Sequence, residues 1–427
     1  MVANRYAVYL AGVALALAAS ACGSSSSQPG SAGALEFAIF HDYSGPNAAY
    51  GPEASAGCFP AARVINAAGG VLGHRVVCVP VDAKGDPADA VPAANRLIAS
   101  SSSLVGVLGA GSDDATAVVP LFEQAQIPIF STTGQDSFDH TRFRYFWRIL
   151  SPDGAQGFAM AAAAKKLGYT RVATVFGNDA AAQGSAPTAI AGVHALGLSL
   201  VASQSLAIGQ PSYRSEAQRL GAAKPQAIIS EADPQTSATY LAEVTQLGTL
   251  PGLITDPVSL APNWIKAVSG AVGAATLRAK DTAVVAYAPA TTLAYRTYTA
   301  ALLASKSAVP SPAQWEADLY SVADYDSVVI MALAMIAAHS TSPATYNSYI
   351  RAVTSPSAKA VIVHTFAAGK AALEAGKRIQ YIGAVGPTVF NQWHNSGQGF
   401  AMEQRTPSGT WRVVNVLSAA EVAAAAG

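Results

Sequence analysis

The chain has 427 residues, enough for two or more domains with hydrophobic cores of their own. It carries 26 basic and 26 acidic side chains, has zero formal net charge and shows no basic stripe, which argues against a nucleic-acid partner. Hydrophobic residues make up 51% of the chain, but after the N-terminus the longest apolar run, which starts at Val328, is too short to span a membrane. That run predicts a buried helix.

The N-terminus has the pattern of a secretion signal. Arg5 precedes an apolar run, and small residues then lead to Cys22. A cysteine at this place resembles the lipobox of bacterial lipoproteins, in which the signal is cut just before a cysteine that becomes lipid-modified. We therefore expect a lipoprotein signal peptide at 1–21, a lipid anchor at Cys22 and a flexible tether at 22–34. A soluble secreted protein and a retained membrane anchor are the alternatives.

Past the tether, short apolar segments alternate with helical patterns. Strands are expected at 36–40, 74–82, 104–110 and 127–132, with helices between them at 53–70, 87–100 and 113–126. An aromatic connection at 143–157 leads to a second series. Its helices are expected at 156–168, 184–197, 212–223 and 235–248, and its strands at 171–178, 199–207, 227–232 and 252–256. Buried strands that alternate with helices indicate an α/β fold with two doubly wound parallel-sheet lobes.

Two cysteines remain once Cys22 is assigned to the anchor. Cys58 lies in the first predicted helix and Cys78 in the strand that follows it. An even pair of cysteines in an exported chain predicts a disulfide, because the compartment is oxidising. Two buried free thiols are the alternative.

Polar side chains and glycines follow nearly every predicted strand. They occupy the loops 41–51, 109–114, 131–136, 177–184, 230–235 and 255–259. Ligands of open parallel sheets bind beyond the carboxyl ends of the strands. Several of these loops run directly into a helix, whose free N–H groups and positive dipole end suit an anion such as a carboxylate. The loops therefore predict a small-molecule site between the two lobes.

The chain shows none of the sequence patterns of a nucleophile elbow, a zinc protease or a phosphate-binding loop. Its seven histidines, among them His41, His140 and His364, are scattered without metal-ligand spacing. Asp113 and Asp114 stand at a predicted helix start, where capping accounts for them. We expect a binding protein that is not an enzyme, with no cofactor and no metal.

Several segments, taken in order, resemble a known family. They are SGPNAAYG, INAAGGVLGHRV, VDAKGDPADAVPAANRLI, VGVLGAGSDDATAVVPLFEQAQIPIFST, FRYFWRILSPDGAQGFAMA and KKLGYTRVATVFGNDAAAQG. Together they are similar to the branched-chain amino-acid type of periplasmic substrate-binding protein, which feeds ABC importers. The resemblance extends to the C-terminal part of the chain and implies two lobes that close like a hinge through three crossing segments. It places the N-terminal lobe at 35–149 and 284–398, and the C-terminal lobe at 150–283 and 399–427.

The resemblance also implies a function and partners. The protein would capture an amino acid or a similar small carboxylate or amide at the extracytoplasmic face of the cell membrane. It would deliver this ligand, as a monomer, to the permease subunits of an ABC importer. A ligand sensor of the same fold, coupled to a membrane signalling receptor, is the alternative, and an exported enzyme on this scaffold is a third hypothesis.

The family's ligand contacts map onto individual residues here. The family's contact serine falls at Ser112, and its next loop, which supplies main-chain and hydroxyl contacts, falls at Thr133 and Gln135. The serine and the free N–H groups there would hold the substrate carboxylate, with Tyr50 as a wall of the site. The acid that pairs with the substrate ammonium falls at Asp256, with Asp233 as an alternative and Glu231 as a weaker one. For Asp233 and Asp256, a helix cap or a turn is an equally good interpretation.

This chain departs from the family pattern at two positions. Ala181 lies nearest to a position where an aromatic residue is usual, and Gln135 stands where a threonine is usual. Both changes affect the side-chain half of the pocket rather than its carboxylate end. They suggest a larger or more polar ligand than leucine.

Overall fold

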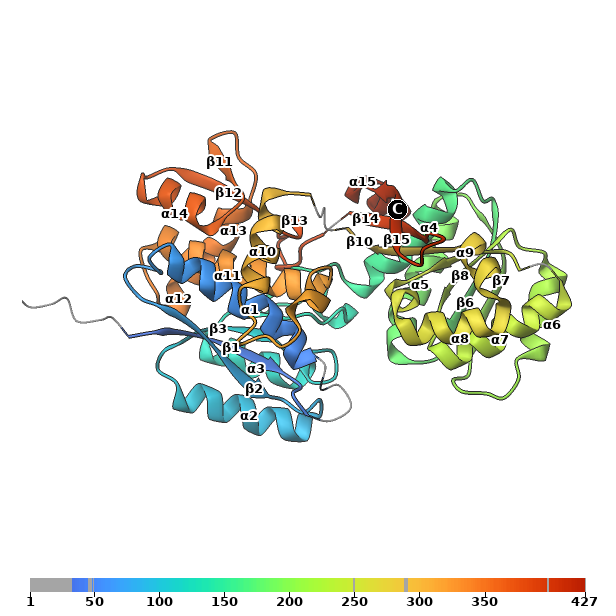
Figure 1. The fold of residues 1–427 in the computed structure, drawn as a ribbon, viewed down its shortest axis with the longest axis horizontal. Helices are drawn as coiled ribbons and strands as arrows, with labels where there is room; N and C mark the ends of the chain where they lie inside the picture. Colours follow the sequence, from blue (N-terminus) through green and yellow to red (C-terminus); the bar gives the residue numbers. More distant parts are fainter. Residues whose placement is uncertain are drawn as a thin grey trace, which may run out of the picture.

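The structure is a computed structural model that describes residues 33–426, except 45–47, 49, 249, 288–290 and 398. The signal peptide predicted at 1–21 and the anchor predicted at Cys22 lie outside the described residues. Figure 1 shows two lobes side by side along the long axis, each with a sheet covered by helices. The α/β fold with two lobes is therefore confirmed.

The first lobe is built on a parallel five-stranded sheet in the order β2-β1-β3-β4-β5. Its strands are β1 (Leu35–His41), β2 (Val76–Asp82), β3 (Leu104–Gly109), β4 (Ile129–Phe130) and β5 (Phe146–Trp147). The helices that follow the first three strands are α1 (Tyr50–Ala67), α2 (Pro87–Ser100) and α3 (Ala115–Ala125). These elements appear in the order that the sequence predicts.

Strand β1 is buried on both faces. Phe37 and Ile39 pack into the cluster that contains α1 and α11 (Leu319–Ala338), whereas Ala38 and Phe40 pack against α2 and α3. Successive side chains of a strand point to opposite faces, so a strand between two helical layers must be apolar throughout. This explains why the run after the tether does not alternate with polar residues.

Helix α11 is the apolar core helix of the first lobe. Among the described residues it alone is long and apolar enough to cross a membrane, yet 89% of its most apolar window is buried inside the protein. Its residues from Val328 to Ile336 are each no more than 2% exposed. The buried helix predicted for this run is confirmed.

The first lobe is completed by segments from the C-terminal half of the chain. They are α10 (Leu293–Leu303), α11, α12 (Pro343–Tyr346), α13 (Ile350–Thr354), α14 (Phe366–Glu374) and a small sheet of β11 (Ala360–Val363), β12 (Arg378–Gly383) and β13 (Gly386–Pro387). In Figure 1 these orange segments lie against the blue ones of the same lobe. The chain thus returns to the first lobe after it has built most of the second.

The second lobe holds a seven-stranded sheet in the order β15-β14-β10-β9-β8-β6-β7. Its strands are β6 (Arg171–Gly177), β7 (Ser199–Leu206), β8 (Ala227–Glu231), β9 (Gly252–Thr255), β10 (Asp281–Ala286), β14 (Phe400–Arg405) and β15 (Trp411–Leu417). The first five are parallel, whereas β14 pairs antiparallel with both β10 and β15, so the sheet is mixed rather than wholly parallel.

Helices cover both faces of this second sheet. They are α4 (Asp153–Lys166), α5 (Ala180–Ala195), α6 (Arg214–Ala223), α7 (Pro234–Leu247), α8 (Pro262–Val272), α9 (Ala274–Lys280) and α15 (Ala419–Ala426). Residues of α4 and α5 share one core cluster, and residues of α6 to α9 share another.

The chain as a whole also has short 3₁₀ helices at η1 (Asp136–Phe138), η2 (Pro257–Leu260), η3 (Pro312–Trp315) and η4 (Asn347–Tyr349). The lobe boundaries drawn from the sequence stay a prediction.

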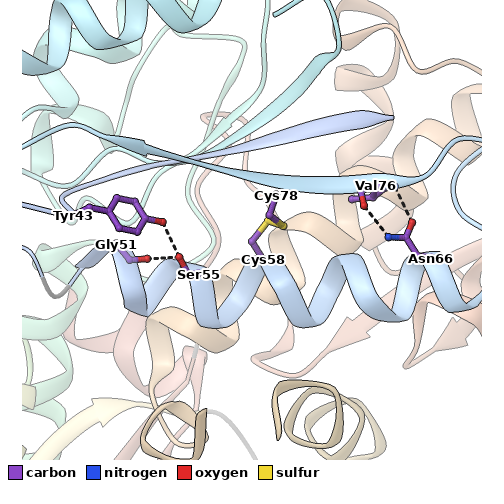
Figure 2. The surroundings of a disulfide bond; sticks show 7 residues. All are labelled: Tyr43, Gly51, Ser55, Cys58, Asn66, Val76 and Cys78. Atoms are coloured by element: carbon purple, nitrogen blue, oxygen red, sulfur yellow. Dashed lines mark hydrogen bonds between the residues drawn. A yellow bond between two sulfur atoms is a disulfide. The ribbon is translucent and has the colours of Figure 1, made fainter. Parts of the chain in front are cut away.

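Helix α1 is tied to strand β2 at two points (Figure 2). Cys58 and Cys78 form a disulfide with their Cα atoms 6.1 Å apart, so the predicted pairing is present and the free thiols are not. Nearer the end of the helix, the Asn66 side-chain amide exchanges two hydrogen bonds with the backbone of Val76, each 2.8 Å long. These bonds fix α1 against the sheet.

Candidate functional site

The carboxyl ends of β3 and β4 bring two predicted contact residues together. The hydroxyl oxygens of Ser112 and Thr133 are hydrogen-bonded at 3.1 Å, although 21 positions separate them in the chain. Ser131 links the same two loops, because its hydroxyl donates to the carbonyl of Ala110 at 2.6 Å and its oxygen accepts from the Thr133 N–H at 3.1 Å. These hydrogen bonds hold the hydroxyl pair in place. Within the pair, Ser112 is exposed whereas Thr133 is buried.

Gln135 belongs to the same cluster. Its backbone N–H donates to the Thr133 hydroxyl oxygen at 3.3 Å, and its side-chain oxygen accepts from the Thr116 hydroxyl at 3.3 Å. The Gln135 side chain is therefore directed toward the first turn of α3, one residue after the helix begins at Ala115.

A buried arginine organises this loop. The Arg148 side chain is 0% exposed and donates to the carbonyls of Thr133 at 3.4 Å and Gln135 at 3.0 Å. It also donates to Asn395 at 3.0 Å and forms an ion pair with Asp139. Arg148 thus positions the loop and has no free donor face for a ligand. Our sequence analysis missed this role, because it depends on contacts with distant segments such as the one that contains Asn395.

Tyr50 is the first residue of α1 and is 44% exposed. Its ring lies edge-on to the imidazole of His41, with ring centroids 6.5 Å apart. Partial burial, followed by the charges of Glu53, Asp113 and Asp42, raises the pKa of Tyr50. An accessible aromatic ring therefore lies among carboxyl groups from three different segments. Residues 45–47 and 49 of the preceding loop are outside the described residues.

Two of the three acids predicted for the second lobe, Asp233 and Asp256, are helix caps. Asp233 accepts from the N–H groups of Gln235 at 2.9 Å and Thr236 at 3.1 Å, and Asp256 accepts from the Val258 N–H at 3.1 Å. The capping interpretation is correct for each of them. One buried oxygen of each carboxylate, Oδ2 of Asp233 and Oδ1 of Asp256, nevertheless has no hydrogen-bond partner among the described residues.

Glu231 and Asp256 form an acidic pair at the ends of adjacent strands β8 and β9. Glu231 accepts a hydrogen bond from the Ser185 hydroxyl. Burial, together with the charges of Asp153 and Asp179, raises the pKa of Glu231 to about 7. Burial and then the charge of Glu231 raise the pKa of Asp256 well above its ordinary value. Because the two groups disfavour each other's ionised form, a nearby cation would favour ionisation of both.

Asp153 connects the two lobes at this place. Its N–H donates to the carbonyl of Gly134 in the first-lobe loop at 2.9 Å. A Cβ atom at Gly134 would collide with the Asp153 carboxylate, and a Cβ at Gly184 in α5 would lie 3.0 Å from the Asp153 Cβ. The loop after β4 and helix α5 therefore both approach Asp153. The sequence analysis did not select this residue, because its place depends on how the lobes meet.

Two other predictions concern this region. Asp114 occupies the N-cap position of α3, but its side chain makes no capping hydrogen bond, so the capping interpretation is wrong for this residue. The backbone of Ala181 lies in α5, whereas its side chain is outside the described part of the chain. Within the described residues, no three His, Cys, Asp or Glu side chains are arranged to hold a metal ion.

Comparisons with known proteins agree on the family that this chain resembles. The profile of a family described as periplasmic binding protein matches residues 35–402. An "Amino acid binding protein" of Pseudomonas aeruginosa is 28% identical over 174 residues, 40% of this chain and 46% of the relative. The chain thus spans about half the length of the curated relatives that it matches.

Two solved structures share the fold across nearly the whole chain. A putative branched-chain amino acid ABC transporter protein from Rhodospirillum rubrum is 19% identical, with a TM-score of 0.67, covering 89% of this chain and 100% of its own. An ABC transporter substrate-binding protein from Desulfitobacterium hafniense, in complex with Leu, is 17% identical, with a TM-score of 0.66 and coverage of 90% and 100%. At these identities the similarity shows a common fold.

Proposed function

This chain belongs to the family of periplasmic binding proteins, which hold ligands outside the cytoplasm without chemically changing them, and from that premise we propose that it captures an amino acid or a similar small carboxylate or amide between its two lobes. The relatives support this ligand class. One is named an amino acid binding protein, and one structural neighbour is in complex with Leu.

The observation that carries the proposal is the hydroxyl pair of Ser112 and Thr133 at 3.1 Å, next to the start of α3. Hydroxyl and backbone N–H donors at a helix N-terminus bind carboxylates well, because the helix dipole adds to the hydrogen bonds. The α-carboxylate of the ligand would bind here. Gln135, whose side chain points to the same turn, would border this end of the site.

The second lobe supplies acidic groups for the ammonium end of a zwitterion. Asp256 has a buried oxygen without a described partner, and Glu231 lies close enough for its charge to act on Asp256. A ligand ammonium placed between them would neutralise the mutual repulsion and ionise both groups. Asp233 is the alternative partner, because it too keeps one buried oxygen without a described partner. Tyr50 would form a wall of the site from the first lobe.

The proposal also includes how the ligand is delivered and where the protein is located. The bound ligand would be presented to ABC permease subunits, as the names of the structural neighbours suggest for those proteins. Cys22 would carry a lipid anchor at the extracytoplasmic face of the cell membrane, and the protein would act as a monomer. Closure would occur about the proposed boundaries at 149/150, 283/284 and 398/399.

Isothermal titration of the purified protein against a panel of amino acids and their amides tests the proposal. We expect at least one member to bind, and Ser112→Ala to weaken that binding by tenfold or more, because a hydrogen bond to a charged group contributes roughly 1.5–3 kcal/mol. Ser215→Ala, which changes an exposed hydroxyl in α6, is the matched control and should bind as the unmodified protein does. Absence of binding by the whole panel would refute the proposed ligand class, and full affinity in Ser112→Ala would refute this carboxylate site.

A further inference from the structure

The C-terminal part of the first lobe carries an excess of positive charge. Between residues 340 and 399 the sequence has one acidic side chain, Glu374, against five basic ones: Arg351, Lys359, Lys370, Lys377 and Arg378. The whole chain, in contrast, has equal numbers of basic and acidic side chains. The positive charge is therefore concentrated in this part of the molecule, and the proposed ligand site at the strand ends does not use it.

Three of these cations gather at the start of two adjacent strands. Strands β11 and β12 are parallel, and Ala360 is paired with Arg378, so Lys359 and Lys377 directly precede paired positions. The side chains of Lys359, Lys377 and Arg378 are exposed. None of the ion pairs among the described residues involves them. Three cations without an ion-pair partner in the described part of the chain thus lie side by side at the surface.

Apolar groups lie among these cations. A groove of about 280 Å³ is lined by Tyr349, Lys377 and Arg378, together with apolar side chains of α11 and α14. Tyr349 is 37% exposed, and Ile362 of β11 is 57% exposed. Because alternate residues of a strand share a face, Ile362 lies on the same face of the small sheet as Ala360 and its partner Arg378. We refer to the following residues as the basic face: Tyr349, Lys359, Ile362, Lys377 and Arg378.

The chain enters the first lobe on the same side of the molecule. Lys370 of α14 donates to the carbonyls of Ala68 at 2.9 Å and Gly70 at 3.0 Å, just after α1 ends. The turn after Gly70 leads to His74, whose Nδ1 atom lies 2.8 Å from the carbonyl oxygen of Gly33. Figure 1 shows α14 and the start of β1 at the end of the first lobe that is away from the second lobe. The predicted tether therefore joins the first lobe at this end.

The place of the tether indicates which partner the basic face meets. A segment of the length predicted for the tether, residues 22–34, reaches at most about 45 Å, so a lipid at Cys22 would keep the first lobe close to the bilayer. Each Lys or Arg near an anionic bilayer strengthens binding about fivefold. Exposed apolar and tyrosine side chains suit the boundary between headgroups and acyl chains. An acidic protein segment would match the cations equally well, but the tether favours the membrane.

We propose that the basic face binds the headgroups of anionic phospholipids in the membrane that carries the anchor. This inference goes beyond ligand capture and rests on the location given in the proposed function. All five residues of the basic face belong to the first lobe. The first lobe would therefore stay against the bilayer while the second lobe moves during closure, and the carboxyl-end loops would stay free to exchange ligand.

Hydrogen–deuterium exchange of the full chain, followed by mass spectrometry, tests this proposal. The protein is mixed with vesicles of phosphatidylcholine alone or with vesicles that also contain phosphatidylglycerol. Every sample has the same N-terminus, so the difference between the two vesicles isolates the effect of lipid charge. We expect exchange in residues 357–380 to slow by about threefold or more with the anionic vesicles only. Raising the salt from about 0.1 M to about 1 M should remove this protection, because the Debye length falls from about 10 Å to about 3 Å.

Matched double variants test the assignment to these cations. Lys377→Gln combined with Arg378→Gln should abolish the protection by anionic vesicles. Lys266→Gln combined with Arg278→Gln removes the same two types of cation from exposed positions of the second lobe and should keep it.

The outcomes separate this proposal from the proposed ligand capture. Equal exchange with both kinds of vesicle would refute binding to anionic lipid, and protection that persists in the Lys377 and Arg378 variant would refute the assignment to the basic face. If polyglutamate protects the segment as strongly as the anionic vesicles do, the partner is an acidic protein segment and the membrane is refuted. The titration against amino acids is independent of all these results, so failure of one proposal leaves the other standing.

Discussion

At the scale of single residues, buried carboxyl groups determine how this protein responds to pH. Burial raises the pKa of Asp114, Glu231 and Asp281 to about 7 in each case. Such groups are protonated more readily in the folded than in the unfolded chain. Their contribution to stability is therefore fully present at low pH and is lost as the pH rises through the folded-state pKa.

Asp281 offers the clearest test, because it is 2% exposed and its Oδ1 accepts from the Thr255 hydroxyl at 2.7 Å. Its pKa rises from 3.8 to about 7, chiefly through burial. This shift corresponds to about 4 kcal/mol of stability that is present below pH 4 and lost above pH 7. We expect Asp281→Asn to reduce the loss of stability between pH 5 and pH 8, as measured by urea unfolding. The exposed Glu374→Gln should keep the full pH dependence, and an equal dependence in Asp281→Asn would contradict the assignment.

Residues of the site were predictable only where local sequence rules apply. Ser112 and Thr133 follow adjacent parallel strands, so the rule on strand ends predicted that their loops contribute to one site, whereas the family resemblance selected these two residues within the loops. The roles of Arg148 and Asp153 depend on tertiary contacts with distant segments, including Asn395 and Gly184, which no local pattern encodes. Asp114 was misinterpreted because its sequence position is that of a cap while its side chain makes no capping bond.

At the scale of secondary-structure elements, the close crossing of α1 and α11 is the most sensitive contact of the first lobe. A Cβ atom on Gly57 of α1 would lie 2.5 Å from both the Cβ of Asp324 and the backbone oxygen of Ser321 in α11, and 2.8 Å from the Tyr325 nitrogen. Two of these atoms belong to the backbone and cannot rotate away. The residue at position 57 must therefore be glycine for the helices to approach this closely.

We expect Gly57→Ala to destabilise the protein by about 1–3 kcal/mol, because a methyl group forced into a packed interface moves the backbone. Equilibrium unfolding in urea measures this change. Gly221→Ala in α6 is the control, since nothing lies within 4 Å of a Cβ added there, and alanine favours a helix. A Gly57→Ala variant as stable as the unmodified chain would show that α1 and α11 do not pack as described.

Among the secondary-structure elements, the strands that are buried on both faces were predicted best. Strands β1, β3, β6 and β8 are buried between helical layers and appear in the sequence as short apolar runs. Strands β14 and β15 were not anticipated as antiparallel partners, since β15 is partly exposed and its pairing depends on a late return of the chain. The small sheet β11-β12-β13 has short strands with exposed residues, which leave little periodic signal.

At the scale of the whole molecule, each lobe is built from segments that are far apart in the sequence. The first sheet uses residues 35–147, the second begins after α4, and α10 to α14 return to the first lobe before β14 and β15 complete the second. Asp153 at the start of α4 contacts Gly134 in the loop after β4 and lies beside Gly184 of α5. A small rotation about the connecting segments would bring the two sets of polar groups together on a ligand, as in hinged domain closure.

A crystal structure with the amino acid that binds most tightly tests the central claim most directly. The account predicts a closed molecule in which the α-carboxylate is within hydrogen-bond distance of Ser112 and Thr133 and the α-ammonium contacts Asp256 or Glu231. A ligand bound to one lobe alone, or one whose carboxylate lies away from Ser112 and Thr133, would contradict it.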